Sequence, residues 1–296
     1  MIRTNQEQLV CQSVIGEITS PLGGINAYRI DPEGHADIYP GVGGITYNLR
    51  IGDPACGLFA DHVEPGVSLS NFTQYQGQPG PNRALNLFSC VGNVAKVVSG
   101  EAKGKTGRVT GKHGGIEHVL LDFPPEVLEE LVIGDKIQIK AYGCGLRLPD
   151  FPGVKVLNLD PALLAVMGLK SLPDGRLEVP VTHQVPARIM GSGIGAPQSN
   201  SGDYDIQLFD APTVREFGLE DLKLGDFVAI IDADASYGRI YKSGGVVIGL
   251  VVHSNCVLAG HGPGAMVVMS SRQELLVPRI DPAANLAAYF SQISSK

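Results

Sequence analysis

The sequence of 296 residues is poor in charge and in aromatic side chains. Charged residues make up 18% of the chain, aromatic residues make up 6%, and tryptophan is absent. An ordinary soluble domain carries roughly 25% charged residues, and intrinsic disorder needs low hydrophobicity with high net charge. With 44% hydrophobic residues, the composition excludes disorder over most of the chain. The scarcity of charge also indicates extra buried surface, so we expect a homo-oligomer.

Cysteine pairs and long apolar runs are also missing. The five cysteines are an odd number and none has the Cys-x-x-Cys spacing, which argues against a disulfide framework and a cysteine zinc site. The start of the chain, MIRTNQEQLV, lacks the apolar core of a secretory signal. The longest apolar stretch, residues 245–260, is interrupted by His253, Ser254 and Asn255, so it is too polar to span a bilayer. These features predict a cytoplasmic protein without membrane contact.

The chain has little positive charge to offer a nucleic acid. Its formal net charge is −7, whereas a dedicated nucleic-acid-binding domain is usually basic. The acidic balance argues against nucleic acid as the main partner and leaves only a local basic patch open.

Glycine and proline, in contrast, are abundant. The chain has 38 glycines and 20 prolines, together about a fifth of its residues, and both residue types break helices and separate strands. The predicted fold is therefore mainly β, a two-part barrel or sandwich with a few short helices. We expect an N-terminal β domain over residues 1–150, irregular and glycine-rich in its first half. A C-terminal β domain with a closing helix is expected over residues 151–296.

Strand patterns are clearest in two parts of the chain. In residues 91–143, VGNVAKVVSG, GRVTG, EHVLLDF and KIQIKAYG read as strands, and a short helix in FPPEVLEELVIGD precedes the last one; this is the order of a small SH3-like barrel. Later, DFVAIIDAD, GGVVIGLVVHS, CVLAG and GAMVVMS read as buried strands. Short helices are expected in DPALLAVMG, TVREFG and DPAANLAAYFSQIS, capped by Asp160, Thr213 and Asp281.

The segment VVSGEAKGKTGRVTGKHGG, residues 97–115, is close to a phosphate-binding loop without matching it. Only three residues separate Gly100 from Gly104, where that loop needs four, and the glycines that follow exclude a helix. The segment instead resembles the KOW hairpin of SH3-like barrels, and the matching residues are Val97, Ser99-Gly100, Lys103-Gly104-Lys105, Gly107 and Val109.

The KOW resemblance implies RNA contacts from the hairpin. The basic residues that would meet phosphates are Lys103, Lys105, Arg108 and Lys112. No aromatic residue lies between them to stack on bases. The alternative interpretation, a hairpin whose lysines are simply solvated, therefore needs fewer assumptions.

The candidate site residues are acids and histidines flanked by glycines, where a ligand can approach the ring and the backbone. They are Asp61 and His62 in ADHVEPG, His113 in GKHGG, Asp232 and Asp234 in IIDADASYGR, His253 at a strand end, and His261 in GHGPG. Imidazole and carboxylate together suit zinc, manganese or iron. We assign His113, His261 and Asp232 to catalysis, and Asp61, His62, Asp234 and His253 to a divalent metal.

Each of these assignments has a structural alternative. Asp232 and Asp234 alternate along a strand and are expected on one face, where two carboxylates could hold a metal or divide acid and base roles. No HExxH or HxH spacing is present, so each residue could instead cap the backbone of a turn. Cys256 could pair with His253 as a nucleophile, although a cysteine beside an apolar strand is usually inert core.

Longer segments resemble the family of domain of unknown function 4438. The likeness runs through GVGGITYNLRIGDPACGLFADHVEPGVSL, NLFSCVGNVAKVVSGEAKGKTGRVTGKHGGIEHVLLDF, LGDFVAIIDADASYGRIYKSGG and VVHSNCVLAGHGPG. It implies a mainly β, two-part architecture and no established activity, substrate or catalytic residue. The segment LGDFVAIIDADASYG also resembles, over a short length, acetamidase/formamidase-type hydrolases, which place an acidic strand end before a glycine-rich turn.

Three classes of function follow from these patterns. The first is a hydrolase or ligand-binding protein for a small polar, amide-like molecule, with a His/Asp pocket and a divalent metal as candidate cofactor. The second is an RNA- or ribosome-associated module that uses the KOW-like hairpin, and the third is a structural homo-oligomer. The observation that separates them is whether His62, His113, His253 and His261 lie in one cleft.

Overall fold

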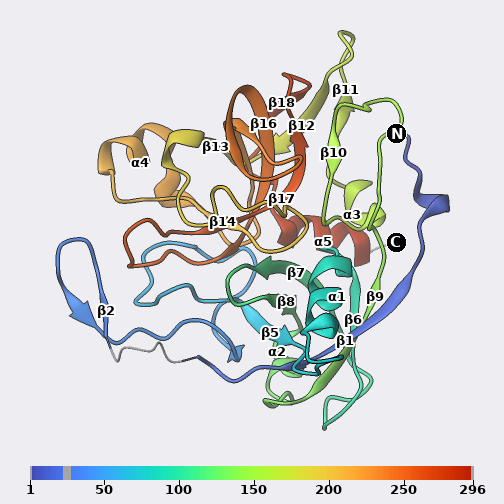
Figure 1. Cartoon of the computed structure of the whole chain (residues 1–296), viewed down its shortest axis with the longest axis vertical. Helices are drawn as coiled ribbons and strands as arrows, with labels where there is room; N and C mark the ends of the chain where they lie inside the picture. Colours follow the sequence, from blue (N-terminus) through green and yellow to red (C-terminus); the bar gives the residue numbers. More distant parts are fainter. Residues whose placement is uncertain (1, 23–27, 295–296) are drawn as a thin grey trace.

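Six strands of the N-terminal half close into a barrel in the computed structural model, which describes residues 2–22 and 28–294 (Figure 1). The strand order is β1-β9-β6-β7-β8-β5, and β5 pairs with β1 to close the barrel; β4 extends the sheet beside β5. The bounds are β1 Gln12–Ile18, β4 Ile45–Thr46, β5 Gly66–Ser70, β6 Val94–Val97, β7 Thr106–His113, β8 His118–Asp122 and β9 Lys136–Ala141. Residues 91–143 thus supply the four predicted strands, but the barrel closes only with β1 and β5.

The barrel interior follows the expected period of two. In β9 exposed and buried residues alternate, and Ile137 and Ile139 point inward with no exposed surface. The hairpin glycines are needed where the chain packs closely. A side chain at Gly107 would lie 2.3 Å from the carbonyl oxygen of Asp122 and 2.7 Å from the ring of Phe123. The prediction of a mainly β fold with a barrel and a few short helices is confirmed.

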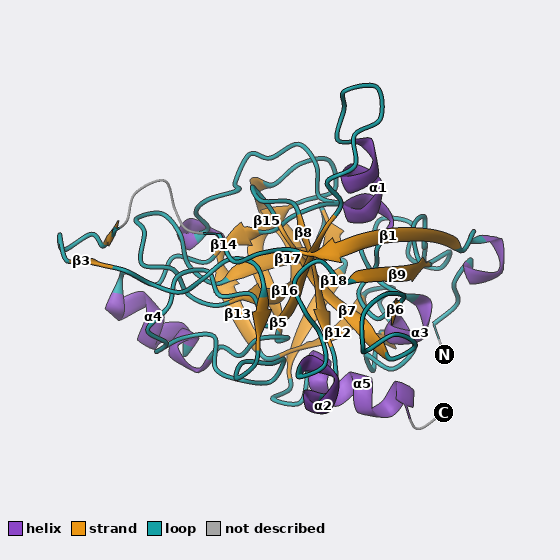
Figure 2. Cartoon of the chain, turned by 90° about the horizontal axis from the view of Figure 1, so that it is seen from below, coloured by secondary structure: helices purple, strands orange, loops and turns teal. Residues whose placement is uncertain are grey.

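The second half forms another large sheet and a smaller one (Figure 2). The large sheet has the order β10-β17-β16-β15-β13, with β14 beside β17, and the small sheet has the order β11-β12-β18. The bounds are β10 Lys155–Val156, β11 Lys170–Ser171, β12 Leu177–Val181, β13 His183–Pro186, β14 Tyr204–Asp205, β15 Phe227–Asp234, β16 Ile240–His253, β17 Gly264–Ser271 and β18 Leu276–Ile280. A short hairpin, β2 Arg29–Ile30 and β3 Ala36–Asp37, lies at one side of the molecule.

One predicted strand, CVLAG, is wrong. Residues 256–260 form a loop, because their amides bond to side chains and not to a neighbouring strand. The Val257 amide lies 3.4 Å from Asp61 Oδ1, and the Leu258 amide lies 3.2 Å from Cys256 Sγ. This loop carries His261 toward the site described below.

Short helices cover the ends and edges of the sheets. They are α1 Gly80–Phe88, α2 Pro125–Leu128, α3 Pro161–Leu164, α4 Ala211–Phe217 and α5 Leu286–Ser294, with single 3-10 turns at Gln6–Gln8, Ala187–Ile189 and Leu219–Asp221. Asp160 caps α3 as predicted, since its carboxylate accepts from the Ala162 amide. The cap of α4 is Asp210 and not Thr213, which donates to it. Asp281 does not cap α5 directly, because it closes a turn with the Ala283 amide before the helix begins.

The barrel has a hydrophobic core of its own, and residues of the first half also pack into the two clusters around the second sheet. Val91 and Leu120 of the first half pack with residues of the second sheet, and residues 49–63 contribute to the other face of that sheet. β7 of the barrel lies against β16 and β17. The junction between the halves is therefore well packed, and the polar side chains buried there need specific partners. Within the described residues, no helix has the length and apolarity to cross a membrane.

Candidate functional site

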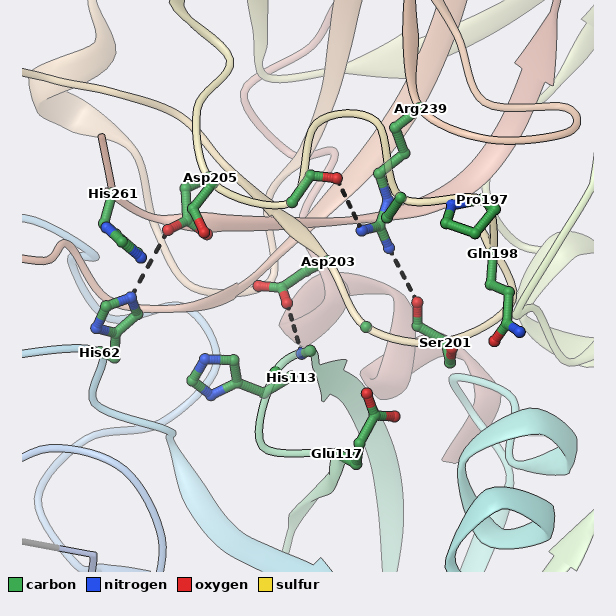
Figure 3. A pocket seen from close by; sticks show the side chains of 16 residues that line it. His62, His113, Glu117, Pro197, Gln198, Ser201, Asp203, Asp205, Arg239 and His261 are labelled. Carbon is green, nitrogen blue, oxygen red and sulfur yellow. Dashed lines mark hydrogen bonds and ion pairs between the residues drawn. The ribbon is translucent and has the colours of Figure 1, made fainter. Parts of the chain in front are cut away.

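Four histidines from four separate segments meet at the junction of the two halves, and Figure 3 shows three of them, His62, His113 and His261. His113 ends β7 and His253 ends β16, while His62 and His261 lie in loops. The ring centroid of His62 lies 5.6 Å from that of His113, 5.0 Å from that of His253 and 5.2 Å from that of His261. The centroids of His113 and His253 are 4.2 Å apart. The structure thus brings into one cluster all four histidines that the sequence singled out.

Each of these imidazoles is oriented through its Nδ1 atom. The facing oxygens are Glu64 Oε1 at 2.6 Å from His113, the Ser254 carbonyl at 2.9 Å from His253, the Ala259 carbonyl at 3.1 Å from His261, and Asp61 Oδ1 at 3.3 Å from His62. A carboxylate or carbonyl on Nδ1 is the usual outer partner of a metal-binding histidine, because it fixes the tautomer that leaves Nε2 free to bind.

Two buried aspartates, Asp203 and Asp205, complete the cluster. Asp203 Oδ2 lies 2.8 Å from His253 Nε2, and the two Asp205 oxygens lie 3.7 Å from His253 Nε2 and 3.6 Å from His62 Nε2. Asp205 Oδ2 is buried without a hydrogen-bond partner, and Asp203 Oδ2 and His253 Nε2 are buried facing each other. Since buried polar atoms need partners, these three atoms mark a place where a cation fits.

Glu64 holds His113 of the cluster in position. It is fully buried, accepts from the Gly43 amide at 2.8 Å and from the Ser68 hydroxyl, and contacts both His113 and His118. Burial opposes its charged form, but the two histidines outweigh burial and hold the pKa of Glu64 well below its usual range. Sequence reasoning missed Glu64, although the segment ADHVEPG contains it.

Backbone spacing leaves room for this arrangement. The register of the second sheet aligns Asp205, Gly264 and His253 in one row across β14, β17 and β16. A Cβ atom on Gly264 would lie 1.8 Å from Asp203 Oδ2 and 2.2 Å from His253 Nε2. Gly264, the last glycine of GHGPG, is therefore required for the two groups to face each other. His62 has a positive φ of 55°, a backbone conformation that tends to persist at functional sites.

The loop that carries Asp203 is held by buried cations. The Lys112 ammonium donates to the Asn200 carbonyl at 2.8 Å and to Asn158 Oδ1 at 2.7 Å. The Arg239 guanidinium donates to the Ser201 carbonyl at 2.9 Å. Burial lowers the pKa of Lys112 to about 8 and also lowers the pKa of Arg239. These contacts fix the loop before any ligand binds.

The cluster opens into a cavity of about 450 Å³. One side is lined by His62, His113, Asp203, Asp205 and His261. The opposite side carries the polar side chains of Gln198, Ser201, Arg239 and Glu117 (Figure 3). Such a volume suits a small molecule.

Two predicted site residues lie elsewhere. Asp232 and Asp234 do not line the cavity. A bulge in β15 between Ile231 and Ala233, with Asp232 at a φ of 62°, interrupts the alternation that predicted a shared face. Asp232 accepts from the Gly244 amide at 2.9 Å, and Asp234 contacts the Ser270 hydroxyl at 3.0 Å and the Arg272 guanidinium at 3.1 Å. Both carboxylates therefore bind their own surroundings.

Cys256 is a partner of Asp61 in this structure. Its thiol donates to Asp61 Oδ1 at 2.8 Å, and burial raises the pKa of the thiol. A thiol held in its neutral form is a poor nucleophile. For Asp61, burial raises the pKa, but contacts with His62, Cys256 and Arg29 outweigh it and lower the pKa.

The basic residues of the KOW-like hairpin are only partly exposed. Lys103 and Lys105 are exposed, whereas Lys112 is fully buried and the Arg108 guanidinium donates to the Gly92 carbonyl at 2.9 Å. The register shift in β7 between Val109 and Gly111 turns Lys112 inward. Lys112 thus cannot meet a phosphate, contrary to the expectation from the hairpin resemblance.

Comparisons with known proteins agree with this architecture. A solved structure described as "Crystal structure of TM1086" is 48% identical, superposes with a TM-score of 0.91, and the match covers 97% of this chain and 99% of that one. No curated protein matches the chain. Two family models, the N-terminal and C-terminal parts of a domain of unknown function, match residues 28–165 and 166–290. The chain therefore belongs to the family described as domain of unknown function DUF4438.

Proposed function

We propose that this protein is a metal-dependent hydrolase of a small polar, amide-like molecule. The observation that carries the proposal is the set of imidazole nitrogens and buried carboxylate oxygens that meet at one side of the cavity. Imidazole and carboxylate donors of this kind suit zinc, manganese or iron.

The first cation would be held by His253 and the carboxylates of Asp203 and Asp205. His62, His113 and His253 offer ligand atoms within 4.8 Å of one another, and so do Asp203, Asp205 and His253. A divalent cation at such a place lowers the pKa of a bound water and polarises a carbonyl oxygen. Glu64 and the Ser254 carbonyl hold two of these imidazoles in position through Nδ1, so little rearrangement is needed on binding.

The remaining polar groups give the cavity its acid–base and binding capacity. With one cation bound, the imidazoles of His62 and His261 are available beside Asp205 to accept a proton from the attacking water. The side chains of Gln198 and Ser201 line the wall opposite (Figure 3), where they can hydrogen-bond an amide. A small substrate carrying a carbonyl group and hydrogen-bonding nitrogen fits this combination.

The proposal is tested by metal removal and reloading. Protein stripped with EDTA is dialysed against Zn²⁺, Mn²⁺ or Co²⁺ and assayed for ammonia release from small amides, beginning with formamide and acetamide. We expect activity only after reloading, its loss in Asp203→Ala, and its retention in the matched control Asp234→Ala. Protein that binds no cation would contradict the proposal. Protein that binds a cation but cleaves no amide would be a ligand-binding protein instead.

We also propose that two copies of the chain associate through the β2–β3 hairpin. The hairpin lies at the side of the molecule (Figure 1), and its apolar side chains are exposed: 58% for Tyr28, 58% for Ile30 and 61% for Ile38. Exposed apolar clusters commonly mark interfaces. Light scattering should report an oligomer for the native chain and a monomer for Ile30→Ser with Ile38→Ser. Val10→Ser, at another exposed position, should leave the mass unchanged; a native monomer would refute this proposal.

A further inference from the structure

We infer that the site binds two divalent cations, one on each side of Asp205, whose carboxylate bridges them. The first cation is the one already proposed, bound by His253 and Asp203, and the second is bound by His62 and His261. This inference rests on the proposed function, because it assigns a second cation to the same cavity.

The donor atoms extend beyond the reach of a single cation. They fall into overlapping sets of three, each within 4.8 Å: His62 with His113 and His253, Asp203 with Asp205 and His253, and His62 with Asp205 and His261. Donors on one zinc ion lie at about 2.0–2.2 Å from it, so two of them are separated by at most about 4.4 Å. In the part of the chain that the structure describes, His261 joins a set only with His62 and Asp205. A cation bound to His261 therefore differs from one bound to Asp203.

Asp205 is the residue common to the two outer sets. Its Oδ1 lies 3.7 Å from His253 Nε2, on the Asp203 side, and its Oδ2 lies 3.6 Å from His62 Nε2, on the other side. These separations are too long for hydrogen bonds but suit two donors of one coordination sphere. Each oxygen of this carboxylate thus faces a different group of imidazoles, as a bridging ligand requires.

Buried donor atoms lie on both sides of Asp205. On one side Asp203 Oδ2 and His253 Nε2 face each other at 2.8 Å, and on the other Asp205 Oδ2 has no hydrogen-bond partner. Both aspartates expose only 5% of their surface, and His253 exposes none. Because water does not reach these atoms freely, a cation on each side would satisfy them.

The second position has the same outer support as the first. Asp61 faces His62 Nδ1 and the Ala259 carbonyl faces His261 Nδ1, which directs both Nε2 atoms toward Asp205. The ion-pair partners found for Glu64, Asp203 and Asp205 among the described residues are histidines only. If these histidines are neutral ligands, the carboxylates keep negative charge for bound cations, and the Arg239 guanidinium near Asp203 and Asp205 offsets part of it.

Two cations about 3.5–4 Å apart are known to act as a clamp on the attacking and leaving oxygens of a hydrolysis. With both positions filled, His62 and His261 become ligands and are no longer proton acceptors. The substrate class stays a small polar molecule with a carbonyl-type oxygen, now placed between the two cations.

The test counts cations in the full-length protein. Metal-stripped protein is equilibrated with Mn²⁺, freed of excess cation, and analysed for manganese per chain and by electron paramagnetic resonance. We expect two Mn²⁺ per chain with a spin-coupled spectrum in the native protein and in the control Asp234→Ala. His261→Ala and the milder His261→Gln should hold one Mn²⁺ with an uncoupled spectrum. Asp205→Ala should lose the coupling.

The outcomes separate this inference from the proposed function. One Mn²⁺ per chain together with amide hydrolysis would overturn the bridged pair and leave the hydrolase intact. Two Mn²⁺ per chain in His261→Gln, or an uncoupled spectrum in the native protein, would also overturn it. Absence of bound cation would refute both. Thermal unfolding of each variant, compared with the native chain, identifies any variant that fails to fold, and the second His261 substitution then decides.

Discussion

Two Asp-x-Asp segments of this protein have opposite surroundings. In Asp232-Ala233-Asp234, each carboxylate has partners from its own sheet: the Gly244 amide for Asp232, and the Ser270 hydroxyl with Arg272 for Asp234. In Asp203-Tyr204-Asp205, Asp203 accepts from the Gly114 amide at 2.7 Å, but its other oxygen faces His253 Nε2 at 2.8 Å, and Asp205 Oδ2 is buried without a hydrogen-bond partner. The carboxylates of the first segment bind neighbouring groups of the fold, whereas those of the second segment face histidines.

The difference shows which buried acid is available for chemistry. A carboxylate whose oxygens are satisfied by the protein stabilises the fold and has little left to offer a ligand. A buried carboxylate with a free oxygen costs stability unless something binds to it. The sequence pattern favoured Asp232 and Asp234 because both lie in a segment that reads as a strand. The carboxylate oxygens that face imidazoles belong instead to Asp203 and Asp205.

The largest effect on stability is expected from substitution of Glu64, which holds His113 in position. Glu64→Ala removes the acceptor of His113, His118 and the Gly43 amide in a fully buried position. We expect a loss of about 3–5 kcal/mol in the free energy of unfolding, measured by urea denaturation. A loss no larger than that of Asp234→Ala would show that the contacts of Glu64 with His113 and His118 do not support the histidine cluster as described.

Cation binding should stabilise the folded chain through Asp203 and Asp205, and not through Asp232 and Asp234. At a free Mn²⁺ concentration of about 100 times Kd, the native chain should gain about 2.7 kcal/mol for each cation bound, measured as a shift of the urea midpoint. Asp203→Ala should lose most of this gain because it removes a ligand, whereas Asp234→Ala should keep it. An equal gain in both variants would break the distinction between the segments.

The segment Asp232-Ala233-Asp234 should contribute to the stability of the fold in the absence of any cation. Asp234→Ala removes the acceptor of the Ser236 amide and the Ser270 hydroxyl. We expect a loss of about 1–3 kcal/mol in the metal-free protein, again by urea denaturation. Asp234→Asn retains one acceptor oxygen and should cost less; a neutral Asp234→Ala would mean that these contacts do not stabilise the strand.

The smallest effect is expected at the bulge. Asp232→Gly removes one hydrogen bond to the Gly244 amide but relieves a left-handed backbone at a φ of 62°. The two contributions oppose each other, so the free energy of unfolding should change by less than about 1 kcal/mol. Asp232→Val, which adds a β-branched side chain in the same conformation, should be clearly more destabilising in the same melts.

Much of the fold was predictable from local patterns. Alternation of apolar and polar residues predicted β9, and the Asp-Pro pair predicted α3. Both elements depend on neighbours along the chain. Glycine context also pointed to His62, His113 and His261. Local pattern failed where a side chain redirected the backbone: in the loop 256–260, whose amides bond to Asp61 and Cys256, and at the bulge beside Asp232.

The sequence by itself determined that this chain would be a turn-rich β protein with histidines in glycine-rich turns, since those properties follow from residue type and short spacing. Only the tertiary structure decided which acids face those histidines. Glu64 meets His113 across 49 residues of sequence, and Asp205 meets Gly264 and His253 through strand register. Contacts between residues so far apart depend on how the two halves pack, which no local pattern records.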